Sequence, residues 1–184
     1  RTFGDQLFAK CTEMMLAIRN LLQPVIAKVQ GVATAAGCQL VATCDLAVAA
    51  DHARFATSGI NYGIYCSTPA VALSRNIHPK KALEMLLTGD FLSAAEAKAE
   101  GLVNKVVAAT ELDDTVWKLA NNIAQKAPDA LRIGKEMFYQ QLGMSLEDAY
   151  AYASDQIVCN ILAPNAKEGL DAFAEKRKPN FEQY

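Results

Sequence analysis

A segment rich in small residues and almost free of charge, GVATAAGCQLVATCD, covers residues 31–45 and includes one polar candidate for chemistry. Gln39 follows a run of two alanines and a glycine at residues 35–37. A glutamine can hydrogen-bond water through its carbonyl and its amide, but it cannot take up a proton at neutral pH. The segment therefore supplies a group that can position a ligand, and it supplies no general base.

The composition excludes several classes of site. Five cysteines occur without a CxxC pair, which argues against a zinc site or a disulfide framework and indicates a reducing compartment. A net charge of −2 leaves no basic excess for binding nucleic acid. The uncharged run at residues 29–44 is too short and too rich in small and polar residues to span a bilayer. A soluble protein without a metal site is expected.

Hydrophobic patterning predicts helices alternating with buried strands in the first part of the chain. Apolar residues recur at helical spacing over residues 3–22, and this stripe should face the core. Short apolar runs predict strands at 25–29, 46–50, 54–56 and 102–107, with helices at 38–43 and 80–87 and a capping box at Ser93 and Glu96. This alternation favours an α/β architecture with helices covering a mainly parallel sheet.

Strand signals end near Thr110, and three helices are predicted beyond it, at 111–126, 129–141 and 146–162. We therefore expect a core over residues 1–110 and a helical region over residues 111–184. The apolar stripes of this region exceed what one small layer would bury, which favours oligomerisation.

Several separate stretches resemble, in order, the crotonase superfamily of enoyl-CoA hydratases and isomerases. They are PVIA at 24–27, GVA at 31–33, GC at 37–38, CD at 44–45, ALEM at 82–85, LTGD at 87–90, GLV at 101–103 and EKR at 175–177. The resemblance spans nearly the whole chain and implies an α/β fold, the crotonase (ClpP-like) ββα superhelix with a C-terminal helical region. The sequence contains no counterpart of the family's first strands or of the small-residue–Gly–x–Asp motif that ends them. These strands are expected upstream of Arg1.

A narrower resemblance joins ATAAGCQL with FATSG and YCST, at residues 33–40, 55–59 and 65–68. This pattern is similar to the divergent mitochondrial enoyl-CoA hydratase-domain-containing paralogues and their bacterial relatives.

The family resemblance implies a site around this turn. It places at Ala36 a backbone N–H that polarises an acyl-CoA carbonyl in an oxyanion hole. It also places Gln39 and Gly59 where hydrating members carry two glutamates, so ordinary hydration is not expected. The alternative is that the small residues merely let a helix pack closely on a strand.

Three side chains lie where relatives place alternative catalytic groups: Tyr65, Cys66 and Ser67. They are candidates for polarising or proton-transfer roles, and the alternative is a loop whose hydroxyls satisfy backbone groups near a helix start. A hydrolase triad of Ser67, His78 and a remote Asp can be written down, but proximity in sequence is no evidence for its geometry.

Near the carboxy terminus, the resemblance places Phe173 and Lys176 where they help to hold coenzyme A. The alternative is a solvated helix end with basic residues that complement its dipole. The resemblance implies a coenzyme A thioester as substrate or ligand, no covalently bound cofactor, and a homotrimer or hexamer.

Two hypotheses remain open. The chain is either a crotonase-type lyase or isomerase of fatty acid metabolism, whose reaction is undefined, or a non-catalytic acyl-CoA-binding or scaffold protein. It would act in the cytoplasm if bacterial and in the mitochondrial matrix if eukaryotic.

Overall fold

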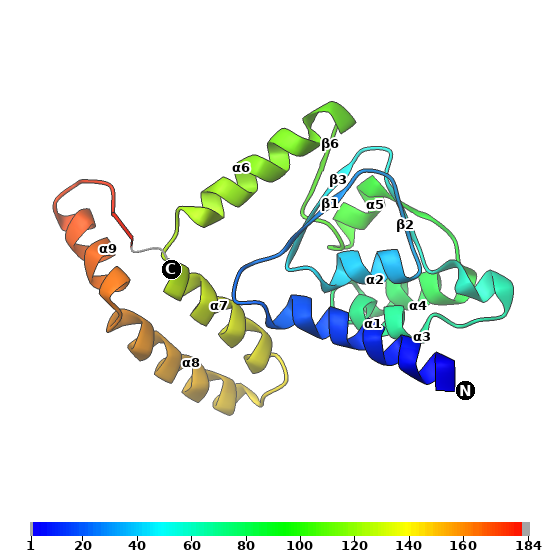
Figure 1. Cartoon of the computed structure of the whole chain (residues 1–184), viewed down its shortest axis with the longest axis horizontal. Helices are drawn as coiled ribbons and strands as arrows, with labels where there is room; N and C mark the ends of the chain where they lie inside the picture. Colours follow the sequence, from blue (N-terminus) through cyan, green and yellow to red (C-terminus); the bar gives the residue numbers. More distant parts are fainter. Residues whose placement is uncertain (1, 182–184) are drawn as a thin grey trace. The chain divides into compact units, whose positions relative to one another are not determined.

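The computed structural model describes residues 2–181, which divide into two compact units (Figure 1). The first unit comprises the chain up to Leu21 and residues 25–118. The second comprises residues 22–24 and the chain from Leu119 onward. The division falls inside helix α6 (Leu112–Ala124), so each unit is described by itself.

The first unit contains two three-stranded sheets. One has the order β1 (Ile26–Val29), β3 (Leu46–Ala50), β6 (Lys105–Val107), and all its pairings are parallel. The other has the order β2 (Val32–Thr34), β4 (Arg54–Ala56), β5 (Leu92–Ser93). There, β2 pairs parallel with β4, and β4 pairs antiparallel with β5. The predicted, mainly parallel strand arrangement is confirmed.

Short helices cover these sheets and enclose the core. They are α2 (Ala36–Thr43), α3 (Ser67–Leu73), α4 (Pro79–Thr88) and α5 (Ala94–Ala99), with 3₁₀ turns η1 (Ser58–Tyr62) and η2 (Ala109–Glu111). Cys38, Phe55 and Leu73 are fully buried, and α2 packs against α3. The capping box predicted at Ser93 and Glu96 is present. The interior is therefore centred on α2, β4 and α3.

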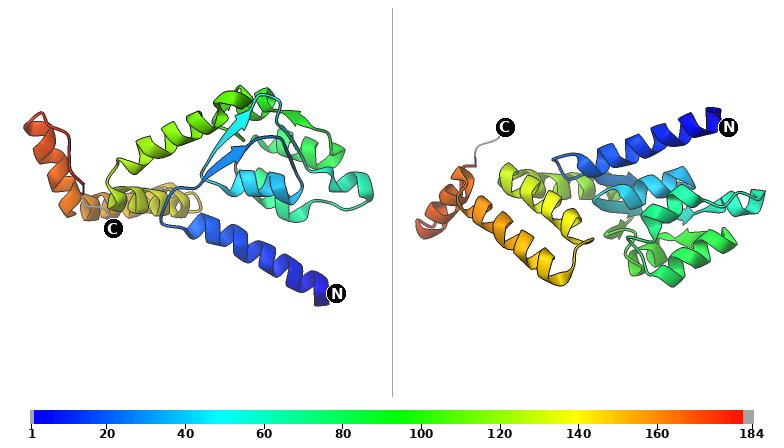
Figure 2. Two further views of the ribbon diagram at one scale, coloured as in Figure 1. Left: turned by 45° about the horizontal axis from the view of Figure 1, so that its top comes forward. Right: turned by 90° about the horizontal axis from the view of Figure 1, so that it is seen from below.

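Helix α1 (Thr2–Asn20) forms where predicted, but its apolar stripe is largely uncovered. Met15 is its only buried residue, while Leu7 and Met14 are each 47% exposed. The helix packs against α2, which has 8 residues against the 19 of α1 and cannot cover the whole stripe. Figure 2 shows the N-terminal end of α1 projecting away from the sheets. The expectation that this stripe faces the core is wrong for the structure of this chain.

Strands β2 and β5, the two 3₁₀ turns and one C-terminal helix were not predicted. Strand β2 has only three residues and lies within the expected turn, and α2 begins at Ala36, before the predicted start at Cys38. Helix α3 begins at Ser67, in agreement with the alternative that the hydroxyl-rich segment lies near a helix start. The unpredicted helix is α9 (Pro164–Ala174), which follows the last predicted helix. Strands of two or three residues leave too few positions for a periodicity to be read.

The second unit contains α7 (Pro128–Gln141), α8 (Leu146–Ile161) and α9. Helix α7 packs against α8, and α8 against α9. No residue of α8 is buried, and the large apolar residues exposed on it include Leu146, Ile157 and Val158. No helix within residues 2–181 has the length and apolar character to cross a membrane.

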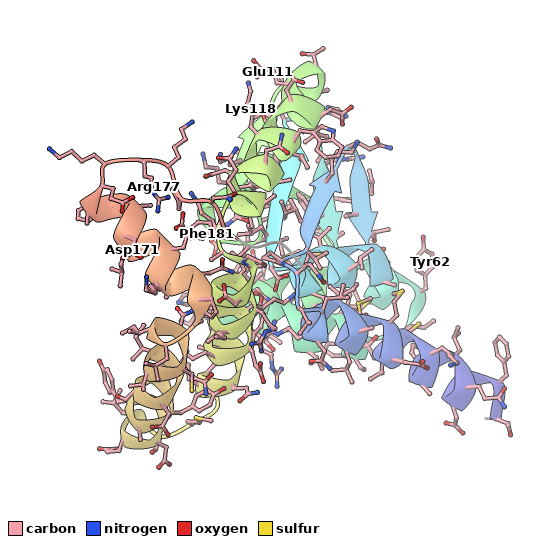
Figure 3. The ribbon with its side chains drawn as sticks, turned by 60° about the vertical axis from the view of Figure 1, so that its left-hand side comes forward. Tyr62, Glu111, Lys118, Asp171, Arg177 and Phe181 are labelled. Carbon is pink, nitrogen blue, oxygen red and sulfur yellow. The ribbon has the colours of Figure 1, made fainter. Side chains whose placement is uncertain are left out.

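Beyond α9, one arginine ties the chain back onto the helix (Figure 3). Both terminal nitrogens of Arg177 donate to the Glu168 carboxylate, at 2.6 and 2.9 Å, and its Nε donates to Glu175. The Asn180 N–H donates to the same Glu168 carboxylate at 2.6 Å. These donors, Arg177 first and Asn180 second, lower the pKa of Glu168 to about 2.

This geometry predicts a pH-dependent attachment of the segment around Asn180. A lowered pKa means that the Glu168 contacts stabilise the fold fully above the carboxyl's ordinary pKa and are lost as pH falls through about 2. In an NMR titration, the Asn180 amide resonance should move with a midpoint well below that of an ordinary glutamate.

Glu168→Gln should abolish that low-pH transition. Glu175→Gln is the matched control, because Glu175 contacts Arg177 and makes no bond to Asn180. A midpoint at the ordinary glutamate value in the unmodified chain would contradict the described contacts.

Candidate functional site

The turn between β2 and α2 has an unusual backbone at Ala35. Its φ is 49° and its ψ is −117°, a conformation that favours glycine. The Ala35 N–H donates to the Ala56 carbonyl at 3.0 Å, which fastens the turn to the end of β4. A strained residue held by its neighbours is typical of functional turns.

Helix α2 begins directly after this residue. Its first internal bond runs from the Gln39 N–H to the Ala35 carbonyl at 3.0 Å. The N–H groups of Ala36, Gly37 and Cys38 therefore precede the helical bonding pattern, at the positive end of the helix dipole. Such N–H groups can stabilise negative charge on a ligand oxygen.

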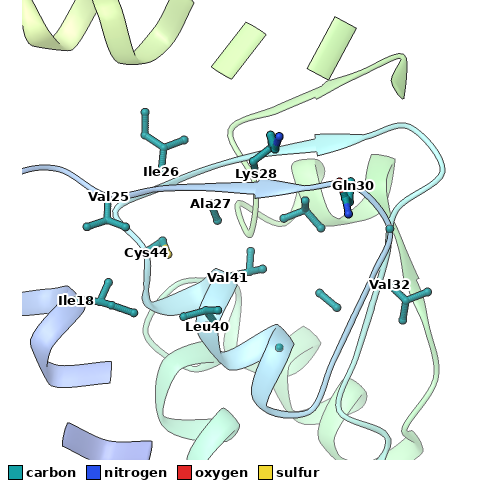
Figure 4. A pocket seen from close by; sticks show the side chains of 14 residues that line it. Ile18, Val25, Ile26, Ala27, Lys28, Gln30, Val32, Leu40, Val41 and Cys44 are labelled. Carbon is teal, nitrogen blue, oxygen red and sulfur yellow. The ribbon is translucent and has the colours of Figure 1, made fainter. Parts of the chain in front are cut away.

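A cavity of about 590 Å³ lies beside this turn (Figure 4). Its walls come from α1, β1, β2 and α2, and Gly37 is the lining residue nearest the start of the helix. A Cβ added at Gly37 would meet no atom within 4 Å, so this side of the turn is open. The remaining lining residues are mostly apolar: Ile18, Val25, Ile26, Ala27, Lys28, Val29, Gln30, Gly31, Val32, Ala33, Leu40, Val41 and Cys44.

Gln39 directly follows the three residues with open N–H groups and is 7% exposed. Its backbone carbonyl accepts the Thr43 hydroxyl at 2.8 Å. Its side-chain amide makes no hydrogen bond to any residue that the structure describes, yet neither amide atom is fully buried. An unpartnered amide that retains some access can take a hydrogen bond from water or a ligand.

Gly59 has no room for a side chain. A Cβ at this position would lie 2.6 Å from the Ile64 carbonyl oxygen and 2.8 Å from the Cys66 sulfur. The loop is closed by a hydrogen bond from the Ile64 N–H to the Gly59 carbonyl at 3.0 Å. Neither a glutamate nor any other side chain fits here unless this backbone moves.

Cys66 and Cys38 are both buried and lie close enough for their charges to interact. Burial, and then the neighbouring Cys66, raises the pKa of Cys38 to about 12. The Cys38 thiol therefore stays protonated and is a poor nucleophile at neutral pH.

The other candidates of this loop differ in exposure. Tyr65 is 42% exposed, and its carbonyl accepts the Ser67 hydroxyl at 3.4 Å. Within residues 2–181, Ser67 is not hydrogen-bonded to His78, and His78 is not hydrogen-bonded to an aspartate, so the structure does not support the hypothetical triad. Among these residues no group of three His, Cys, Asp or Glu could hold a metal ion.

Two hydroxyl residues at this site were missed from the sequence. Thr34 Oγ1 and Ser58 Oγ lie 2.8 Å apart and are partly buried. Thr34 ends β2 just before the strained Ala35, and Ser58 opens η1 just before Gly59. In the sequence, the only sign of their importance is that Thr34 lies next to the Ala35–Ala36 turn and Ser58 lies next to Gly59.

The two C-terminal candidates lie in the second unit. Phe173, in α9, is 84% exposed, and Lys176 has a φ of 56°, in the left-handed region. Arg177 is bound by two carboxylates, whereas Lys176 makes no ion pair to any residue described. An exposed ring and an uncommitted ammonium suit an aromatic base and a phosphate.

Comparison with known proteins confirms the resemblance and the fold. The family model described as enoyl-CoA hydratase/isomerase matches residues 3–184. The mitochondrial enoyl-CoA hydratase domain-containing protein 3 of Rattus norvegicus is 47% identical over 179 residues, which cover 97% of this chain and 60% of that protein. A crotonyl-CoA hydratase of Syntrophomonas wolfei is 36% identical over 168 residues, covering 89% of this chain and 64% of the relative.

Solved structures of enoyl-CoA hydratase family proteins superpose closely on this chain. An enoyl-CoA hydratase of Mycobacterium smegmatis superposes with a TM-score of 0.97 at 54% identity, covering all of this chain and 71% of that chain. The human enoyl-CoA hydratase domain-containing protein 3 superposes with a TM-score of 0.96 at 47% identity, and the match covers 98% of this chain and 72% of that chain. The chain spans about 60% of the length of the domain-containing relatives that it matches.

The strain at Ala35 predicts a stabilising substitution. Ala35→Gly should raise the free energy of unfolding by about 1 kcal/mol, because a strain on the order of 1–3 kcal/mol is relieved at an entropic cost of about 0.5–1 kcal/mol. Urea denaturation measures this change. Ala36→Gly, at a position without positive φ, should bring no gain, and equal effects of the two substitutions would contradict the described turn.

The crowding at Gly59 predicts the opposite. Gly59→Ala should lower the free energy of unfolding by about 1–3 kcal/mol, the usual cost of overpacking. Gly37→Ala is the control and should be nearly neutral, since its Cβ meets nothing within 4 Å. Adding Cys66→Ala should recover only part of the loss, because the Ile64 carbonyl remains in place. A stable Gly59→Ala variant would overturn the description of this loop.

Proposed function

Because the chain belongs to the enoyl-CoA hydratase/isomerase family, we propose that it binds a coenzyme A thioester and stabilises an enolate-like form of the acyl group. The observation that carries this proposal is the turn at Ala35, which leaves the N–H groups of Ala36 and Gly37 open beside an apolar cavity. The Ala36 N–H is one oxyanion donor. The curated relatives are longer than this chain, and we assign no second donor within residues 2–181.

Ordinary hydration is not part of this proposal. Gln39 cannot accept a proton at neutral pH, and Gly59 cannot hold any side chain in its present loop. In this function Gln39 positions water or the acyl group through its unpartnered amide. Cys66 is the buried polar group beside Gly59, whereas Tyr65 and Ser67 are more exposed.

The second unit supplies two further elements of the proposal. Phe173 and Lys176 hold the adenine ring and a phosphate of coenzyme A. The exposed apolar residues of α8 pack against other copies in a trimer or hexamer. Residues 111–184 act as this assembly region, after a core at residues 1–110. We place the protein in the mitochondrial matrix if it is eukaryotic and in the cytoplasm if it is bacterial; the Rattus norvegicus relative is named as mitochondrial.

The alternative is a non-catalytic acyl-CoA-binding or scaffold protein. The absence of both carboxylates favours it, since Gln39 is an amide and Gly59 has no space for a side chain in its present loop. The two functions differ in which ligand they prefer. A catalyst of enolate chemistry binds the enolate form better than the ground-state thioester, whereas a scaffold need not distinguish them.

Calorimetric titration of the complete protein tests both functions. Acetoacetyl-CoA, which mimics the enolate, should bind saturably and more tightly than butyryl-CoA. Gly37→Ala should weaken acetoacetyl-CoA binding by about tenfold, because its methyl group enters the open space at the turn. Gly134→Ala, in α7 and equally uncrowded, should leave the affinity unchanged.

Equal affinity for the two thioesters would favour the scaffold. Absence of binding at millimolar concentration would contradict both functions.

A further inference from the structure

The N–H of Ala36 has a fixed direction only if the turn before it is held in place. Ala35 occupies a conformation that alanine disfavours, so a free turn would relax and rotate the following peptide. Backbone bonds hold one side of it: Thr34 pairs with Ala56 in the β2–β4 ladder, and the Ala35 N–H donates to the Ala56 carbonyl. The ladder ends there, and no further strand pairing constrains Ala36.

Within residues 2–181, the Thr34 side chain makes one hydrogen bond, and this bond adds to the backbone attachment. The hydroxyls of Thr34 and Ser58, 24 positions apart in sequence, lie 2.8 Å from each other. Ser58 is two residues beyond Ala56, so this bond fastens the turn to the chain just after the last ladder position. The partial burial of the pair strengthens the bond relative to one in water.

The same pair connects the two sides of the candidate site. Thr34 precedes the open N–H groups of α2, while Ser58 precedes Gly59, which packs directly against Ile64 and Cys66. The Gly59 carbonyl accepts the Ile64 N–H at 3.0 Å, and the space around Gly59 is filled, so the residue after Ser58 is fastened to its loop. A movement of either hydroxyl would therefore be transmitted to the turn rather than absorbed by the loop.

We propose that Thr34 and Ser58 are positioning residues, whose hydroxyl–hydroxyl bond holds the strained Ala35 turn so that the Ala36 N–H points at the acyl oxygen. This inference rests on the proposed function. The pair does not touch the reacting atoms, and it acts through the backbone at Ala35. One bond joins the two hydroxyls, so removal of either hydroxyl removes this side-chain bond and leaves the backbone bonds to Ala56 in place.

Thr34→Val keeps the shape of the side chain and removes the hydroxyl, and Ser58→Ala removes the partner. In the complete protein, each variant should bind acetoacetyl-CoA about tenfold more weakly, and the double variant no more weakly than either. Coenzyme A without an acyl group should bind as before, because it has no carbonyl for the turn to polarise. Thr34→Ser keeps a hydroxyl and should restore affinity to within about twofold.

A second measurement needs no ligand. Hydrogen exchange of the Ala35 amide, which is bonded to Ala56, should accelerate about tenfold in Thr34→Val and Ser58→Ala and stay slow in Thr34→Ser. A merely structural role would lower overall stability and weaken both ligands alike. Unchanged Ala35 exchange, or equal losses for acetoacetyl-CoA and coenzyme A, would overturn the positioning role.

The outcomes separate this inference from the proposed function. If the unmodified protein binds acetoacetyl-CoA and the variants bind it equally well, only the positioning role fails. If the unmodified protein binds no thioester, the proposed function fails, and the positioning role fails with it whatever the exchange rates show.

Discussion

The parallel pairing of β2 with β4 brings the chain to Ala56 on one strand and Thr34 on the other, and α2 starts two residues later. Only Ala35 lies between the end of β2 and the start of α2, so this single residue must redirect the backbone. It does so with a positive φ, held by its N–H bond to Ala56. The result is a helix whose first N–H groups are open and whose direction is determined by the sheet.

The loop at Gly59 imposes a second constraint, which depends on the first. Residues 56–58 hold the turn, and the next residue must be glycine because Ile64 and Cys66 fill the space around it. The absence of a carboxylate at this position is therefore a matter of packing as well as of residue type. An acid introduced at Gly59 would have to displace a backbone carbonyl, whereas an acid at Gln39 would need no such movement.

The sequence predicted the parts of the structure that have a strong local signal. Helix α1, strands β1, β3 and β4, and the Ser93–Glu96 capping box all lie close to their predicted positions. It did not predict β2 or β5, because two or three residues carry no readable period. The uncovered stripe of α1 shows another limit, since helical periodicity identifies an apolar face and not what covers it.

The site shows the same division between local and long-range information. Residue types alone established that Gln39 is no base, and the family resemblance singled out Ala36 and Gly59. The strain at Ala35 could not be predicted, because alanine has no preference for a positive φ and only the β2–β4 register imposes it. The Thr34–Ser58 bond joins positions 24 residues apart, and no local pattern relates them.

The Ala35 turn and the crowded loop at Gly59 affect different contributions to catalysis. An oxyanion donor typically contributes about 10²–10³-fold to rate, and a backbone N–H requires no particular side chain, so the role that we propose for Ala36 does not depend on a carboxylate. General acid–base catalysis contributes about 10²–10⁴-fold, and it requires a titratable group at a defined distance. Neither Gln39 nor Gly59 provides one. A protein that has an oxyanion donor but no general base can stabilise an enolate, but it cannot remove the proton that creates one. Any turnover therefore requires a base other than Gln39 or Gly59.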